Sequence, residues 1–172
     1  LTHEFKTAHG RTVRDGGGIT PDVTIEGHDY SRLTYSLVYS GIIQEYALDF
    51  VRSHDSAEED FHLADKDWDG FVAFAKTKEF DYRSSAKTYF DRMKKELEKD
   101  GLSKNMSAEL DALQKALEMD KETFLKLKKD EIVPFIEEEI AVRYHFQEAG
   151  IKIRLRYDDQ LKKALASPMI EI

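Results

Sequence analysis

The sequence predicts a mainly α-helical protein, a multi-helix bundle with a small β appendage at its N-terminus. From Ser31 onwards, apolar residues recur at steps of three and four, which is the period of a helix with one buried face. Before that point, two short runs alternate apolar with polar residues, as half-buried strands do: Thr2–Thr7 and Asp22–Glu26. Apolar residues make up 41% and charged residues 35% of the 172 residues, which is typical of a globular chain with its own core.

A glycine-rich stretch, Gly10–Val23, joins the two predicted strands. Gly16–Gly18 allow positive φ angles, and Pro21 favours an extended Thr20. A phosphate-binding glycine loop would run into a helix, whereas this one runs into Pro-Asp-Val-Thr-Ile, so a structural turn is the better interpretation. Two short strands cannot stabilise themselves in water. We therefore expect them to need a sheet that this chain does not otherwise encode, with Phe5 facing inward.

Two motifs in the chain match a known pattern. Residues 5–11 end a strand as Phe-x-Thr-x-x-Gly-Arg, and residues 18–23 follow as Gly-Ile-x-Pro-Asp-Val. Residues 143–150, Arg-Tyr-His-Phe-Gln-Glu-Ala-Gly, give a second match far downstream. The first pair resembles the end of the protease core in the C-terminal processing (tail-specific) serine peptidases. The second is similar to a run in the helical tail of some bacterial members.

This resemblance implies a Ser/Lys catalytic dyad upstream of the Gly-Ile-x-Pro-Asp segment, so we expect the dyad to lie outside this chain. Residues 1–29 would then be the terminal β segment of the protease core, and residues 30–172 a helical C-terminal domain that supports the core, assembly or access of substrate tails. The implied partners are the rest of the peptidase with a PDZ domain, its substrates and a second copy. The implied location is the bacterial periplasm or cell envelope. A freestanding helical protein-interaction domain remains the alternative.

The helical part divides at recognisable caps and breakers. We predict one amphipathic helix over Ser31–Ser53 with Gly41 inside it, a polar connector over His54–Glu59, and a short helix led by Ala64–Asp69. The next predicted helix runs from Ser84 or Ser85 to Asp100, with Tyr89, Phe90 and Met93 inward, and two others begin at Ser107 and at Asp120. A long helix follows, with a boundary or kink near Asp130 because of Pro134 and a stop at Gly150. A closing helix runs from Asp158 or Asp159 to Leu165, before Pro168.

Several polar groups are candidate sites. Asp65-Lys66-Asp67-Trp68-Asp69-Gly70 carries oxygens at the first, third and fifth positions of a calcium loop, but Lys76 stands where a glutamate is required, so an acidic helix start is favoured. The six histidines lack zinc spacing, and His145 is expected to be a packing residue. We interpret Glu137-Glu138-Glu139 as a solvated helix face, and Ile151–Tyr157, with basic Lys152, Arg154 and Arg156, as extended or a turn.

Two Ser/Lys pairs, Ser31 with Lys66 and Ser84 with Lys87, lie in polar stretches where a lysine pKa would not be depressed, so neither is expected to form a dyad. The chain has no cysteine, which excludes disulfides and thiolate metal sites. Its net charge of −8 argues against a nucleic-acid partner, and no apolar run reaches membrane-spanning length. We therefore predict no catalytic residue, cofactor or metal site in this chain.

Overall fold

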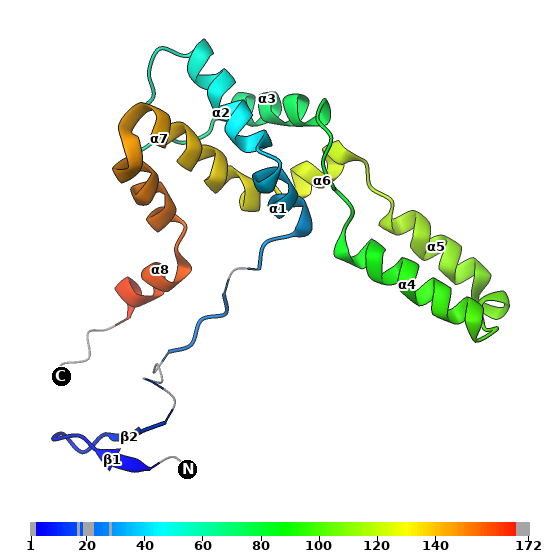
Figure 1. Cartoon of the computed structure of the whole chain (residues 1–172), viewed down its shortest axis with the longest axis horizontal. Coiled ribbons are helices and arrows are strands. Elements are labelled where there is room, and N and C mark those ends of the chain that lie inside the picture. The colour runs from blue at the N-terminus through cyan, green and yellow to red at the C-terminus, as the bar shows by residue number, and fades with distance from the viewer. Residues whose placement is uncertain (1–2, 17, 19–22, 28, 168–172) are drawn as a thin grey trace.

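The computed structural model describes residues 3–16, 18, 23–27 and 29–167, and it confirms a mainly α-helical fold. Across these ranges the chain forms eight α-helices, a 3-10 turn at Ser103–Met106 and one antiparallel pair of strands (Figure 1). The strands are β1 (Glu4–Lys6) and β2 (Thr12–Arg14). The helices are α1 (Arg32–Tyr39), α2 (Ile42–Ser53), α3 (Asp65–Lys76), α4 (Ser85–Lys99), α5 (Ser107–Leu117), α6 (Lys121–Leu127), α7 (Lys129–Arg156) and α8 (Asp159–Ala166).

The core lies between helices that are distant in sequence. Helix α2 packs along α7, α1 contacts both, and α3 packs on α6. The side chains at the centre are fully buried aliphatic and aromatic groups, each of which stabilises the fold by about 1.5–3 kcal/mol. They include Leu33, Leu37, Ile43, Phe71, Leu125, Ile132, Ile136 and Ile140.

The N-terminus of α1 is fixed by a carboxylate from α7. Ser31 caps the helix, and Glu131 accepts hydrogen bonds from the Ser31 backbone N–H at 2.8 Å and from the Thr34 hydroxyl at 2.9 Å. Burial would raise the pKa of Glu131, but the hydrogen bonds from Lys128, Ser31 and Thr34 outweigh it and lower the pKa to about 2. A negative charge at this position also matches the positive end of the α1 dipole.

The predicted single helix over Ser31–Ser53 is wrong, because the chain breaks at Gly41. Helix α1 ends at Tyr39, and Gly41 adopts a left-handed conformation, with φ of 75°, before α2 starts at Ile42. This conformation costs a residue with a side chain about 1–2 kcal/mol and costs glycine little. The glycine is therefore a turn residue between two helices, and the apolar period continues across it.

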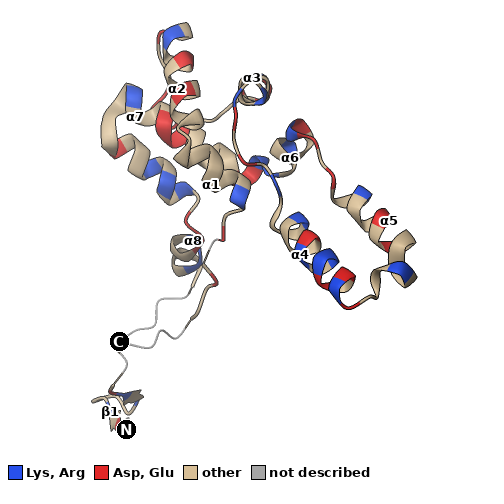
Figure 2. Ribbon diagram, turned by 45° about the vertical axis from the view of Figure 1, so that its right-hand side comes forward, with Lys and Arg blue, Asp and Glu red and all other residues tan. Residues whose placement is uncertain are grey.

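Helices α4 and α5 form a hairpin that projects from the body of the fold (Figures 1 and 2). Ser84 caps α4 as predicted, accepting the Lys87 N–H at 3.0 Å, and Gly101 follows the helix with φ of 73°. However, Phe90 is the only residue of α4 that is buried, and Tyr89 is 70% exposed. The expectation that Tyr89 and Met93 point inward is thus wrong, since α4 packs mainly against α5 and the 3-10 turn that joins them.

The long helix α7 reverses direction within its own length. Phe146 has φ of 64° and ψ of −170°, and it separates a first arm, residues 129–145, from a second arm, residues 147–156. The predicted stop at Gly150 and the predicted extended segment Ile151–Tyr157 are both wrong, because the second arm is helical. Gly150 is buried there, and a Cβ atom on it would lie 2.4 Å from Cγ2 of Val142 on the first arm. Glycine is needed so that the two arms can touch.

The predicted boundary near Asp130 lies close to the junction of α6 and α7 at Lys128, and Pro134 stands inside the second turn of α7. The closing helix α8 is capped by Asp158, whose side chain accepts the Leu161 N–H at 2.9 Å. The predicted stop at Pro168 lies outside the described residues.

No helix within the described ranges has both the length and the apolar character needed to cross a bilayer.

The strand assignment is correct for β1 only. β1 pairs with β2, with Phe5 opposite Val13, after a turn in which the Gly10 N–H donates to Thr7 O at 2.9 Å. The described part of the second predicted strand, residues 23–26, has no strand pairing. Pairing within a short hairpin closes a smaller loop and costs less chain entropy than pairing across the glycine stretch. Most of the Gly-Ile-x-Pro-Asp motif, residues 19–22, lies outside the described residues.

Candidate functional site

A buried carboxylate joins the two arms of α7. The side chain of Glu137, on the first arm, is 2% exposed and accepts hydrogen bonds from three directions. The Arg156 guanidinium donates at 2.9 Å, the Tyr157 hydroxyl at 2.8 Å and the Leu63 backbone N–H at 2.9 Å. Burial, and then the bond to Glu137, raises the pKa of the Tyr157 phenol. We call Glu137, Arg156 and Tyr157 the clasp. Because its charge is buried and matched, the clasp holds the second arm in place.

The same reversal also fixes the connector that precedes α3. The Tyr144 hydroxyl donates to His54 O at 2.5 Å, and His145 Nε2 lies 2.7 Å from Ala57 O. From the other side, Arg156 donates to Phe61 O at 3.0 Å and pairs with Asp60. The connector is polar and has no helix of its own. Three of its carbonyls, those of His54, Ala57 and Phe61, are therefore satisfied by side chains from both arms of α7.

The solvated-face interpretation of Glu137-Glu138-Glu139 is wrong. Glu137 is buried in the clasp, Glu138 is paired with Arg154 at 2.7 Å, and Glu139 is paired with Arg143. The sequence contains a signal for this arrangement. Glu137 stands four residues from both Val133 and Ala141, on the apolar stripe of the first arm. A carboxylate at a core position needs buried partners.

The basic residues at the end of α7 likewise form ion pairs on a helix rather than lying on an extended segment or a turn. Arg156 belongs to the clasp, Arg154 binds Glu138, and Lys152 pairs with Glu59 and with Glu148. All of these pairs except Lys152–Glu148, which lies within the second arm, link the second arm to the first arm or to the connector. The reversal at Phe146 brings the acidic run of the first arm and the basic run of the second arm together.

A cavity of about 510 Å³ opens beside the clasp, between the first arm of α7, its C-terminal end, the segment before α1, and α8. Its apolar lining is formed by Ile25, Tyr30, Pro134, Phe135 and Tyr157. Its charged lining is Glu26, Asp130, Glu138, Arg154, Asp158, Asp159 and Lys162, so that carboxylates exceed cations by three. Burial raises the pKa of Glu138, with Arg154 opposing it.

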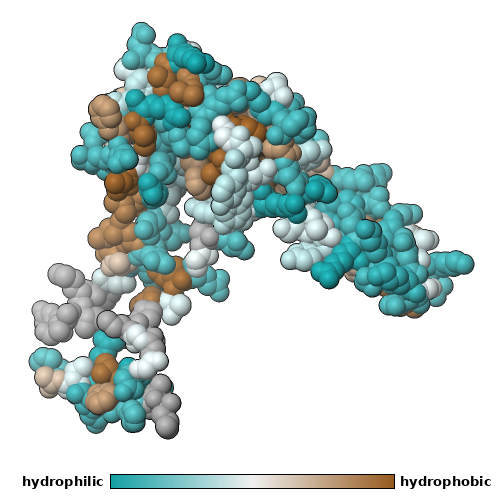
Figure 3. All heavy atoms as spheres, in the orientation of Figure 1, coloured by the Kyte–Doolittle hydropathy of each residue, from teal (hydrophilic) through white to brown (hydrophobic). Residues whose placement is uncertain are grey.

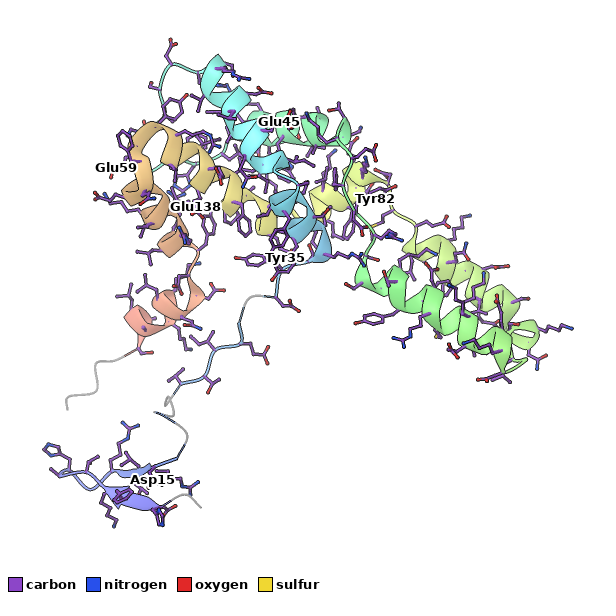
Figure 4. The ribbon with its side chains drawn as sticks, in the orientation of Figure 1. Asp15, Tyr35, Glu45, Glu59, Tyr82 and Glu138 are labelled. Carbon is purple, nitrogen blue, oxygen red and sulfur yellow. The ribbon has the colours of Figure 1, made fainter. Side chains whose placement is uncertain are left out.

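Aromatic side chains continue from this cavity onto the surface of α1. The Phe135 and Tyr30 rings meet edge to face with centroids 5.1 Å apart, and Tyr30 meets Tyr35 in the same way at 6.1 Å. Tyr35 then stacks on the exposed Tyr39 at 6.1 Å. Figure 4 labels Tyr35 on α1 and Glu138 on α7. Such rings offer flat apolar surface at little cost in side-chain entropy, which suits contact with another polypeptide.

The other candidate groups lie at helix starts or in local ion pairs. Asp65, Asp67 and Asp69 lie on the first turns of α3 rather than in a loop, and Asp65 binds Lys129 at 2.7 Å. The Ser84 hydroxyl caps α4, and Lys87 extends away to Asp91 at 2.7 Å. In the part of the chain that the structure describes, no group of three or more His, Asp or Glu side chains is placed to share a metal ion.

The described residues thus form a helical domain whose polar side chains are engaged mainly in caps and ion pairs. Residues 33–167 match the family described as "Probable PDZ-protease, C-terminal helical domain". This match covers most of the chain, so the chain belongs to that family and is a protease-associated helical domain. No curated protein and no solved structure matches it.

Proposed function

We propose that this chain is the C-terminal portion of a tail-specific serine endopeptidase, and that it supports the protease core without supplying catalytic residues. Two independent findings support the proposal. The helical part belongs to a PDZ-protease family, and residues 5–11 with 18–23 resemble the end of a tail-specific protease core. The bacterial periplasm or cell envelope is the location that this proposal implies.

The observation that carries the supporting role is the uncovered β hairpin. Phe5 and Val13 face each other across the two strands, yet Phe5 is 54% and Val13 40% exposed. A two-stranded ribbon is marginal alone, and its open edges can pair with strands of another chain. We propose that residues 1–29 complete a sheet of the protease core, and that residues 30–172 form the helical domain.

An apolar flank on the helical part provides a second contact for the same core. Figure 3 shows apolar side chains gathered over the second arm of α7 and over α8. Ile151, Leu155 and Leu165 are all exposed there. Covering apolar surface contributes roughly 25 cal/mol for each Å² removed from water, so this flank favours association.

The test is to express the whole reading frame and this chain alone, and to assay both on a peptide with an unstructured apolar tail. We expect cleavage by the whole protein only, and a strong loss of cleavage in its F5S/V13S double variant. The control is Y89S/M93S, on the exposed face of α4. Cleavage by this chain alone that is abolished by substituting one of its own serines would refute the proposal.

A freestanding protein-interaction domain is the second candidate, and the α4–α5 hairpin favours it. Tyr89, Met93 and Leu113 expose apolar surface on a projection that contacts little else. The upstream sequence separates the two candidates. A serine and a lysine in a protease core, preceded by a PDZ domain, supports the peptidase, whereas an upstream region without them supports the interaction domain.

A further inference from the structure

We infer that the cavity beside the clasp binds a lysine or arginine side chain, next to an apolar residue, from an extended segment of another protein. The inference does not depend on the proposed peptidase role. It starts from the volume of about 510 Å³, which falls within the range of ligand pockets and can hold a long basic side chain with its neighbour.

Charge determines the kind of ligand. Within the described part of the chain, neither Glu26 nor Asp130 has a hydrogen-bond or ion-pair partner, and both carboxylates line the cavity. The two cations of the lining are already engaged, Arg154 with Glu138 at 2.7 Å and Lys162 with Asp159 at 3.3 Å. The uncompensated charge is therefore negative, so the cavity attracts a cation and repels an acidic segment.

The walls add a preference for cations attached to apolar stems. The Tyr157 ring already has two cations of this chain over it, Arg156 at 5.9 Å and Lys162 at 6.0 Å. Phe135 and Tyr30 supply further ring surface in the same cavity. Aromatic faces attract ammonium and guanidinium groups, and the methylene stem of lysine or arginine packs on such surfaces. An incoming cation would compete with Lys162 for Tyr157.

The aromatic series outside the cavity accounts for the neighbouring apolar residue. Tyr30 belongs both to the cavity wall and to the series that continues through Tyr35 to the exposed Tyr39. A segment whose basic side chain enters the cavity would place its next residues along these rings. An extended chain advances by about 3.3 Å per residue, so a few residues span the series.

The experiment measures fluorescence anisotropy of the full chain with two labelled Gly/Ser peptides. One carries a central Arg-Phe-Lys and the other a central Gln-Phe-Gln. We expect the basic peptide to bind more tightly, with an affinity that falls as salt rises. In the double variant E26Q/D130N, its Kd should rise roughly five- to thirty-fold, the size expected when a few charge and cation–π contacts are weakened.

Two further variants make the test specific. K162Q removes the competing cation, so its Kd for the basic peptide should fall about two- to five-fold. E98Q/D111N removes two carboxylates from exposed positions on α4 and α5, and it should bind as the unaltered chain does. Circular dichroism checks that each variant is folded.

Any one of three results would overturn the inference. They are equal binding of the two peptides, an unchanged Kd in E26Q/D130N, and the same loss of affinity in E98Q/D111N. Failure to detect binding of the basic peptide at low salt would also reject it. Because none of these measurements involves peptide cleavage, they leave the proposed peptidase role to its own test.

Discussion

Replacing Arg156 by leucine should destabilise the fold through the carboxylate that it leaves behind. The Glu137 side chain is 2% exposed, whereas that of Arg156 is 22% exposed. Removing one partner of a buried ion pair costs about 3–5 kcal/mol, because the remaining charge is uncompensated. Tyr157 and Leu63 still donate hydrogen bonds to Glu137, so we expect the lower end, about 3 kcal/mol. For a chain of this size the melting temperature should fall by about 6–12 °C.

The assay is urea unfolding followed by far-ultraviolet circular dichroism, with the slope of the transition checked for constancy. The matched control is R154L, the same substitution two residues earlier in the same arm. The Arg154 side chain is 68% exposed, so its pair with Glu138 should contribute less than about 1 kcal/mol. A double-mutant cycle adds E137Q, which removes the buried charge. The double variant E137Q/R156L should lose less stability than the two single variants together.

The reasoning is refuted if the free energy of unfolding of R156L lies within about 0.5 kcal/mol of that of the unaltered chain, because this is the range of an ordinary surface substitution. It is also refuted if R156L and R154L lose equal stability. Additive effects in the double-mutant cycle would show that Glu137 and Arg156 do not interact.

Three further substitutions test other parts of the fold. G150A should cost about 1–3 kcal/mol, because its Cβ would meet Val142 at 2.4 Å, and adding V142A should restore part of the loss in thermal denaturation. The pKa of Glu131 is lowered from 4.5 to about 2, so the stability that its charge gives the fold is complete above pH 4.5 and is lost as the pH falls towards 2. In urea unfolding, the free energy of unfolding of E131Q should therefore depend less on pH across this window than that of the unaltered chain. S84A should cost about 1 kcal/mol, and hydrogen exchange should rise in the α4–α5 hairpin while the core stays protected.

Local signals in the sequence were sufficient for several helix ends, where the structural choice is made within a few residues. Ser84, Asp120 and Asp158 each cap a helix at the predicted place, since a cap depends on one side chain and a backbone N–H three residues later. Gly101 follows α4 in the left-handed conformation for an equally local reason.

The sequence failed where the choice depends on distant residues. Gly150 is a typical helix end, but here it is the contact point between two arms of one helix. The reversal that creates this contact occurs at Phe146, where a positive φ is unusual for a residue with a side chain. Without that reversal, Glu137 and Arg156 would lie far apart along one straight helix and would not meet. The sequence did not predict the cavity either, because α7 contributes lining residues from both arms and these come together only through the reversal.

The position of the α4–α5 hairpin between two neighbouring helices has a consequence for the order of folding. Helix α6 packs on α3, yet the whole hairpin separates them in sequence, so their docking must close a long loop. Ser84 and Glu118, at the two ends of the hairpin, line one common hollow. If the hairpin forms first from local contacts, only two short connectors remain to be closed, and we expect the α3–α6 contact to form faster. The projection would then speed assembly of a core to which it contributes almost no buried side chains.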